Sequence, residues 1–290
     1  MNVLITGSPS GQLFYELLRT APAGATILDT RRGDSPRLDI TDSAAVMKFV
    51  SEHKPEIIFN AAAYTAVDKA ESDASAAHAV NTSAVQTLAD AANSVGARLV
   101  QISTDFVFGC SDGHPFRVDA PTAPISVYGK TKQEAEQIVV ATCPQNGSVI
   151  RTAWVYSSNG NNFVKTMLRL MNERGEVGVI ADQIGAPTWA KRLAEAMWQT
   201  VDRKVPGIWH WTGAGACSWY DFAVAIAEEG KAAGLINSDV VVNPLRTDQY
   251  PTPATRPGYS VLELTKTWDA FELKAPHWRE DLRLMLQELL

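Results

Sequence analysis

Short apolar runs alternate with longer amphipathic stretches through the first half of the chain, and this alternation limits the fold more than any other feature. The apolar runs predict strands at Asn2–Thr6, Thr26–Asp29, Ile57–Asn60, Arg98–Ser103 and Ser148–Thr152. The stretches between them predict helices at Gln12–Thr20, Ser43–His53, Ser75–Val95 and Val127–Thr142. Strands that alternate with helices of this length form parallel sheets with helices on both faces. The pattern therefore predicts an α/β fold built on a doubly wound parallel sheet.

The pattern changes after about residue 153, where loops rich in glycine, asparagine and proline separate the periodic segments. Further helices are expected at Asn162–Glu173, Trp189–Val201, Ser218–Ala233 and Trp278–Leu290, with a short strand at Gly207–Trp211. We therefore expect a sheet domain over 1–153, completed by parts of the later chain, and a smaller α/β region over 154–290. Ligands of doubly wound folds bind beyond the carboxyl ends of the strands, so the smaller region would form a substrate wall there.

Composition and charge exclude several classes of protein. A net charge of −6 and scattered lysines and arginines give no footprint for nucleic acid. No apolar stretch approaches the length of a membrane span, and the start of the chain lacks a signal-peptide pattern, so we expect a cytoplasmic protein. Three widely spaced cysteines indicate neither a disulfide framework nor a metal cluster.

A turn of small residues follows the first strand and opens a helix, which is the context of a phosphate-binding loop. Helix amide groups and the helix dipole attract a dinucleotide pyrophosphate at this place. The residues predicted to hold the cofactor here are Gly7, Ser10, Gly11, Gln12 and Leu13. Phe14 stands where a third glycine is usual, so the first helix should sit differently against its strand.

The end of the second predicted strand offers groups for the adenosine end of a dinucleotide. Asp29 can bond the ribose hydroxyls, which favours NAD, whereas Arg31 and Arg32 can pair with a 2′-phosphate, which keeps NADP open. Asp39 and Ile40 could meet the adenine edge, although helix capping explains that aspartate equally well.

Tyr128 stands four residues before Lys132 at the start of a predicted helix. One helical turn separates them, so the phenol and the ammonium share a face and can act on one bound molecule. A nearby ammonium is expected to lower the pKa of the phenol towards neutral pH. The pair therefore predicts proton transfer to a substrate oxygen, as a carbonyl reduction requires.

Several further motifs occur in a fixed order with this pair. They include the alanine-rich run from Asn60 to Glu71, the Ser103-Thr104-Asp105 run, and the segments 151–156, 160–163, 182–188 and 250–257. Together they resemble the extended short-chain dehydrogenase/reductases, and within them the dTDP-4-dehydrorhamnose reductase family. The resemblance spans the whole chain and implies a Rossmann-type fold, NADPH or NADH as cofactor, and a small dTDP-sugar as substrate.

The resemblance also implies roles for individual residues. Tyr128 would protonate the C4 oxygen of a keto sugar, Lys132 would lower the tyrosine pKa and hold the nicotinamide ribose, and Thr104 would bond the same oxygen. Further cofactor contacts are expected from Ala61, Ala62, Ala63, Tyr64 and Thr65. Asn81 would steady the active-site strand.

On the substrate side, Trp154 would offer a flat apolar face to the deoxysugar and Arg256 would pair with the diphosphate. Polar contacts to the sugar nucleotide are expected from Asp105, Asn161, Asn162, Asp182, Gln183 and Thr188.

Alternatives to this interpretation stay open. A sibling reductase of opposite C4 stereochemistry would use the same residues, and a non-catalytic dinucleotide-binding regulatory subunit would share the fold. Some members of the family dimerise through magnesium held by glutamates, so a homodimer is open. Glu16 could match one ligand, but Lys191 and the end at Leu290 leave the rest without support, and we expect no essential metal.

Overall fold

A six-stranded parallel sheet forms the centre of the computed structural model, which describes residues 1–28, 38–109, 111 and 113–290. Across the sheet the strands are β10 (Gly207–His210), β5 (Gly147–Thr152), β4 (Arg98–Thr104), β3 (Ile57–Asn60), β1 (Asn2–Thr6) and β2 (Thr26–Leu28). Every neighbouring pair is parallel, so all carboxyl ends meet at one edge. The doubly wound α/β prediction is confirmed.

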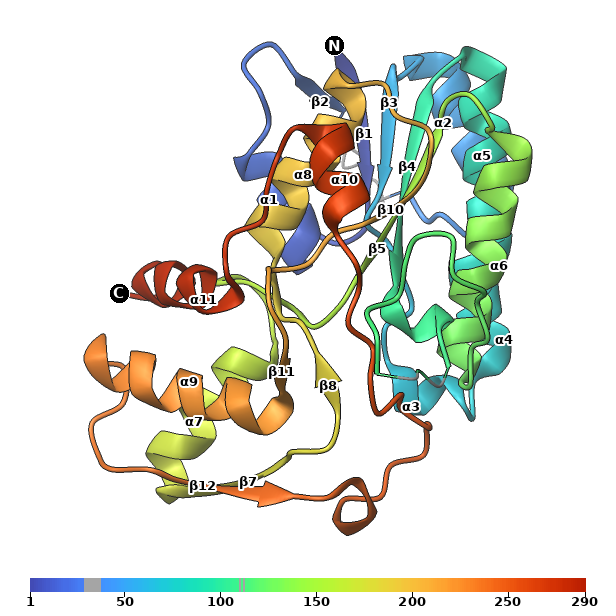
Figure 1. The fold of residues 1–290 in the computed structure, drawn as a ribbon. Helices are drawn as coiled ribbons and strands as arrows, with labels where there is room; N and C mark the ends of the chain where they lie inside the picture. Colours follow the sequence, from blue (N-terminus) through green and yellow to red (C-terminus); the bar gives the residue numbers. More distant parts are fainter. Residues whose placement is uncertain (29–37, 110, 112) are drawn as a thin grey trace.

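The two faces of the sheet are covered by different helices because successive strand residues point to opposite sides (Figure 1). Val3 and Ile5 face a core shared with α1 (Gln12–Arg19), α8 (Ala190–Asp202) and α10 (Thr265–Phe271). Leu4, between them in sequence, faces α2 (Ser43–His53), α5 (Ala84–Val95) and α6 (Val127–Thr142). Phe14, in the first turn of α1, is buried in the first core, so the bulky residue that replaces the usual glycine packs between α1 and the sheet.

Two local expectations differ from the structure. The segment predicted as one helix over Ser75–Val95 is three pieces, namely α4 (Ala74–His78), a π-helical turn at Ala79–Ser83, and α5. β10, assigned from sequence to the smaller region, pairs with β5 and completes the main sheet. The residue pattern of a short strand between loops does not identify the strand with which it pairs. The sequence alone therefore could not show which sheet contains β10.

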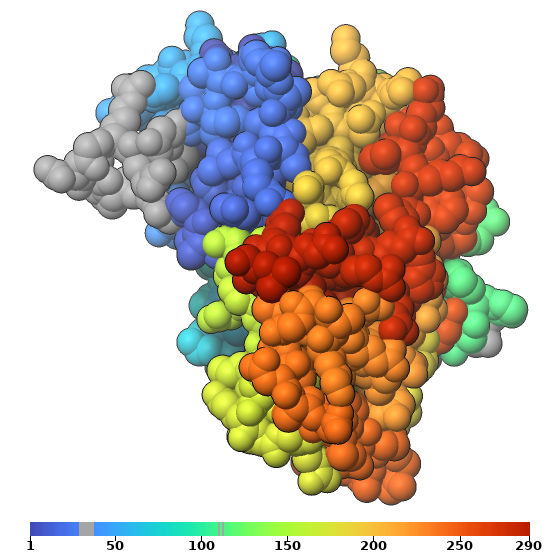
Figure 2. All heavy atoms as spheres, turned by 90° about the vertical axis from the view of Figure 1, so that its left-hand side faces the viewer, coloured from blue at the N-terminus to red at the C-terminus, as the bar shows by residue number. Residues whose placement is uncertain are grey.

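The remaining elements form the smaller region of the molecule, which lies below the sheet in Figure 1. Its helices are α7 (Phe163–Arg174), α9 (Trp219–Ala232) and α11 (Trp278–Gln287). Three two-stranded pairs accompany them: β7 (Glu176–Ile180) with β12 (Val241–Leu245), β6 (Val155–Tyr156) with β9 (Thr188–Trp189), and β8 (Ile184–Gly185) with β11 (Cys217–Ser218). Figure 2 shows α11, in dark red, lying across the junction between α1 and α9.

Short helical turns complete the described chain. They are α3 (Val67–Ala70) and the 3₁₀ turns at Asp105–Val107 and Thr247–Gln249. Within the described ranges, no helix has the length and apolar character needed to cross a lipid bilayer.

Candidate active site

Side chains from three adjacent strands are bonded to one another at the carboxyl edge of the sheet. The Thr6 hydroxyl donates to the Asn60 carbonyl oxygen at 2.6 Å, and the Asn60 amide donates to Gln101 at 2.7 Å. Gln101 in turn donates to the main-chain oxygen of Ile102 at 2.7 Å, and Lys132 Nζ donates to the same oxygen at 2.5 Å. We call these five residues the strand-edge network. It links the strand before the phosphate loop to the lysine of the Tyr-Lys pair.

Thr104, Asp105 and Tyr128 meet where β4 ends. The Thr104 hydroxyl donates to Asp105 Oδ1 at 3.0 Å and is hydrogen-bonded to Tyr128. Burial raises the pKa of Tyr128 to about 12, and the Asp105 charge adds to this while the Thr104 hydrogen bond opposes it. Burial also raises the pKa of Asp105 to about 6. The phenol is therefore protonated at neutral pH and able to donate a proton.

The expected lowering of the tyrosine pKa by Lys132 is wrong for this structure. The lysine side chain is 1% exposed, and its ammonium is bonded to the Ile102 carbonyl. Burial lowers the pKa of Lys132 to about 8, against the opposing effect of the Glu136 charge. The sequence placed the two residues on one helix face, but it could not reveal that burial would dominate both groups.

The start of α6 is fixed by close contact with the turn after β4. A Cβ atom on Gly129 would lie 2.2 Å from the Phe106 carbonyl oxygen, so only glycine fits between Tyr128 and the rest of the helix. The Phe106 ring packs edge-on against Tyr128, with ring centroids 5.7 Å apart. Ser126 caps the helix by accepting from the Gly129 amide at 3.1 Å. These contacts set where the phenol lies.

Asn81 steadies the loop after β3, in line with the role implied by the resemblance. Its side chain accepts from the Tyr64 amide at 2.8 Å and donates to the Tyr64 carbonyl at 3.1 Å and to Thr131 at 3.1 Å. Asn81 lies in the π-helical turn, a feature common at functional sites. Of the predicted cofactor residues here, Ala61, Ala62, Ala63 and Tyr64 are half-buried and Thr65 is exposed.

The phosphate loop has the form that a dinucleotide requires. Gly7 has φ +113°, and a Cβ there would lie 3.2 Å from the main chain of Ala61 and Ala62. Within the described residues no side chain caps α1 at Gly11, and the buried Gln12 Oε1 has no hydrogen-bond partner. Ser10 is exposed and Leu13 half-buried. A loop with uncapped helix amides fits the pyrophosphate of a dinucleotide, whereas the unpaired Gln12 oxygen is an acceptor and would need a donor other than phosphate.

The predicted adenosine contacts are only partly visible. Asp29, Arg31 and Arg32 lie outside the described residues. The Asp39 carboxylate accepts from the Thr41 amide at 2.9 Å and the Thr41 hydroxyl at 2.8 Å, in the turn before α2, while the neighbouring Asp42 caps that helix through the Ala45 amide. Ile40 is buried in the core beneath α2.

Trp154 lies at the junction of the sheet and the smaller region. Its indole stacks on Trp219, with ring centroids 3.6 Å apart and planes at 12°. Its φ of +48° is rare for a bulky residue and marks a strained position. Trp219 therefore supports the aromatic residue that is predicted to face the sugar. Trp209 and Trp211 do pack in the core.

Most of the predicted polar sugar contacts are engaged elsewhere in the fold. Asn162 caps α7 through the Lys165 amide at 3.1 Å. Asp182 accepts from the Thr247 amide and hydroxyl, and Gln183 donates to that hydroxyl at 3.1 Å. Asn161 is exposed. Thr188 is fully buried and accepts from the Thr152 hydroxyl at 3.3 Å.

Arg256, the predicted diphosphate ligand, lies against the short helix α3. Its Nη1 and Nη2 atoms donate to the two carboxylate oxygens of Asp68 at 2.9 and 2.7 Å. The Arg256 pair lowers the pKa of Asp68. The segment that carries the arginine is therefore tied to the loop that leaves β3.

Comparisons with known proteins agree with this geometry. A family model described as RmlD substrate binding domain matches residues 1–290. The dTDP-4-dehydrorhamnose reductase of Salmonella typhimurium is 39% identical over 295 residues, covering 100% of this chain and 98% of that protein. This chain belongs to the dTDP-4-dehydrorhamnose reductase family.

Solved structures of the same family superpose closely on this chain. A crystal structure of a dTDP-4-dehydrorhamnose reductase from Clostridium acetobutylicum has a TM-score of 0.91 and 41% identity, covering 100% of this chain and 99% of that one. A second, from Bacillus anthracis and in complex with NADP, has a TM-score of 0.90 and 35% identity, covering 99% of each chain. The resemblance found in the sequence motifs is thus confirmed.

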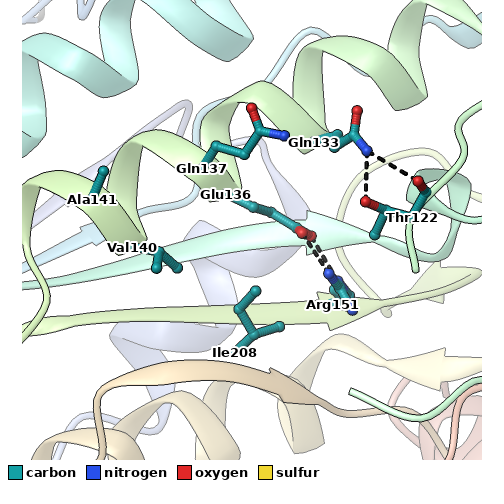
Figure 3. Close-up of a pocket in the computed structure, with 8 residues that line it drawn as sticks. All are labelled: Thr122, Gln133, Glu136, Gln137, Val140, Ala141, Arg151 and Ile208. Atoms are coloured by element: carbon teal, nitrogen blue, oxygen red, sulfur yellow. Dashed lines mark hydrogen bonds and ion pairs between the residues drawn. The ribbon is translucent and has the colours of Figure 1, made fainter. Parts of the chain in front are cut away.

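Two residues to which the sequence motifs assigned no role, Glu136 and Arg151, lie behind the site, between α6 and the sheet. Glu136, one turn after Lys132 on α6, accepts from Ser103 at 2.5 Å and forms a bidentate pair with Arg151 at 2.8 and 2.6 Å. Figure 3 shows this pair in a cavity between α6 and the sheet. The cavity contains none of the predicted site residues, so it is not the substrate site. The spacing of Glu136 from Lys132 is the signal that could have found it.

A magnesium site built on Glu16, left open by the sequence, does not fit the residues present. Arg19 pairs with Glu16 at 3.0 Å and with Glu288 at 2.7 Å, and Lys191 Nζ lies 3.4 Å from Glu288. Two cations thus occupy the space between the two carboxylates. Among the described residues, no group of three or more His, Cys, Asp or Glu side chains is arranged to hold a metal.

Proposed function

We propose that this chain reduces the C4 keto group of dTDP-4-dehydro-6-deoxy-L-mannose (dTDP-4-dehydrorhamnose) to give dTDP-L-rhamnose, with NADPH or NADH as the reductant. The observation that carries the proposal is the placement of Thr104 and Tyr128 together where β4 ends, with the half-buried phenol protonated because its pKa is raised. Related proteins that span the whole chain bear the name of this activity.

The reduced nicotinamide, when bound, supplies the hydride that reaches C4 of the sugar. As the carbon accepts that pair of electrons, the carbonyl oxygen takes the proton of the Tyr128 hydroxyl and becomes the alcohol. Thr104 would turn its hydroxyl proton from Asp105 to the same oxygen and so stabilise its developing charge. The tyrosinate left behind regains a proton from solvent.

The phosphate loop would hold the cofactor pyrophosphate, and Lys132 would also bond the nicotinamide ribose. Trp154, supported by Trp219, would face the apolar side of the deoxysugar, and Arg256 would bond the diphosphate. A cytoplasmic location and a homodimer belong to the proposal as well, and light scattering of the purified chain tests the second.

A coupled assay tests the activity. The keto sugar nucleotide is supplied with NADPH or NADH, cofactor oxidation is followed by absorbance, and the product is identified by NMR. We expect oxidation and a rhamnose product. Failure with both cofactors would refute the reductase, and a talose product would assign the opposite stereochemistry.

The variant Tyr128→Phe tests the proton donor. It removes only the hydroxyl, so we expect turnover to fall at least a hundredfold while cofactor binding, measured by fluorescence, stays within about twofold. Full turnover in this variant would move the proton donor to another residue.

A further inference from the structure

The four-residue helix α3 carries two acidic side chains that hold separate parts of the proposed site. Asp68 binds the segment that carries Arg256, and Glu71, directly after α3, binds the start of α6. These two residues are three positions apart, on one helical turn. In Figure 1 α3 lies between the start of α6 and the late segment of the chain that descends past it.

Asp68 holds the 252–256 segment by its side chain and its main chain together. Besides the two bonds to the guanidinium, Asp68 Oδ1 accepts from the Ala254 amide at 3.1 Å. Arg256 Nη1 also donates to the Thr252 hydroxyl at 2.6 Å and to the Ala254 carbonyl at 3.1 Å. The plane of the guanidinium is therefore fixed from one end.

The opposite edge of that guanidinium remains available. Asp68 occupies the edge formed by Nη1 and Nη2, and an arginine has a second fork formed by Nε and the other Nη2 hydrogen. Among the described residues, no hydrogen bond uses Nε of Arg256. The arginine side chain is 23% exposed, so this edge can reach a ligand. A guanidinium held at one edge offers phosphate oxygens a bidentate site that is already oriented.

Glu71 holds the start of α6, next to the proton donor Tyr128. Its Oε1 accepts from the Val127 amide at 2.9 Å, which is the first amide of α6 and directly precedes Tyr128. The first amides of a helix have no partner within the helix, so an external carboxylate there fixes the helix start. Together with the Ser126 cap it holds the residue that positions the phenol.

We propose that α3 sets the separation between the diphosphate ligand and the proton donor, with Asp68 and Glu71 as positioning residues for Arg256 and Tyr128. The inference rests on the proposed function. A sugar nucleotide is bound at its diphosphate and reacts at C4, so the two contacts must be held at a fixed spacing for the carbonyl oxygen to meet the phenol. One rigid helical turn that binds both sides provides that spacing.

Four variants of the full chain test the proposal by separating KM from kcat. Asp68→Asn should raise the KM for the sugar nucleotide about tenfold, since one charge-assisted bond to Arg256 is lost, and leave kcat and the NADPH KM within about twofold. Glu71→Ala should lower kcat about tenfold with little change in KM, and Glu71→Gln, which keeps an acceptor oxygen, should restore it. Lys69→Gln is the matched control on α3, because its side chain is 68% exposed.

Calorimetry with dTDP alone gives a second readout for Asp68 that needs no turnover. Its dissociation constant should rise in Asp68→Asn by the same factor as KM. A lower KM or tighter dTDP binding in Asp68→Asn would overturn the proposal, because Asp68 would then compete with the diphosphate. Equal loss in Glu71→Ala and Glu71→Gln would overturn the role of Glu71. Inactive wild type that still binds dTDP more tightly than Asp68→Asn would refute only the proposed reaction.

Discussion

The strand-edge network and the substrate wall over 154–256 are held by different kinds of contact. In the network, Thr6, Asn60, Gln101 and Lys132 are at most 2% exposed and are bonded from strand to strand. In the wall, Asn162 and Asp182 cap local turns, and Asp182 and Asn161 are exposed. The lysine of the Tyr-Lys pair is thus fixed by the sheet, whereas the wall is fixed by local loop contacts.

This difference predicts how the two regions respond to substitution. A change that moves the buried edge should reduce kcat because the reacting groups lose their alignment. A substitution that removes one turn-capping hydrogen bond in the wall should change KM only slightly, because neighbouring contacts still hold the loop. Four substitutions or conditions test this contrast.

Gly129→Ala should have the largest effect. The added Cβ would lie 2.2 Å from the Phe106 carbonyl oxygen, so α6 must move away and carry Tyr128 with it. Because a displacement of about 1 Å can reduce catalysis about a hundredfold, we expect kcat to fall by that factor. Stopped assays of NADPH oxidation measure it, with circular dichroism to verify folding. The exposed neighbour Lys130→Ala is the control, and an active Gly129→Ala would show that α6 tolerates the shift.

Glu136→Gln should destabilise the protein by about 3 kcal/mol, because it leaves the buried Arg151 guanidinium without its charged partner. Urea unfolding measures the free energy. The exposed pair of Arg169 and Glu173 provides the matched control, since Glu173→Gln should change stability by less than about 0.5 kcal/mol. If Glu136→Gln and Glu173→Gln lost similar free energies of unfolding, the expected difference between the buried and the exposed ion pair would be refuted.

The pH dependence of kcat/KM should show an alkaline limb near pH 8. The pKa of Lys132 is lowered to about 8, so the ammonium is charged below this pH and loses its proton as pH rises through it. Tyr128, with a pKa of about 12, stays protonated over this range. We expect about a tenfold fall per pH unit above the limb. The Glu136 charge raises the lysine pKa, so Glu136→Gln should move the limb to lower pH; an unmoved limb would assign it to another group.

Sequence periodicity was sufficient for the sheet because each strand alternates between two buried faces and each helix has a clear apolar side. It failed for β10, whose four residues carry no mark of the strand beside them. The π-helical turn at Ala79–Ser83 was also missed, since no local pattern distinguishes it from the helices on either side.

Sequence spacing was sufficient for site residues that lie on one helix, as Tyr128 and Lys132 do on α6. The pKa values of Tyr128 and Lys132 could not be predicted, because they depend on burial and on the carbonyl group that the Lys132 ammonium binds. Asp68 and Arg256 are 188 residues apart in sequence, so their pairing depends on the folded arrangement of two regions. The burial of Thr188, which is predicted to contact the sugar, likewise depends on the folded arrangement.

Asp182→Asn should have the smallest effect of the four. Its carboxylate accepts from the Thr247 amide at 3.0 Å and the Thr247 hydroxyl at 2.7 Å, and asparagine keeps one acceptor. We expect KM for the sugar nucleotide to change less than about threefold and kcat to stay constant, since a net hydrogen bond contributes about 1 kcal/mol. Thr247→Val removes part of the same cap without touching the carboxylate, so equal effects of the two variants would identify Asp182 as a cap. A tenfold rise in KM in Asp182→Asn alone would instead indicate direct substrate contact, and the wall would then be as sensitive as the sheet edge.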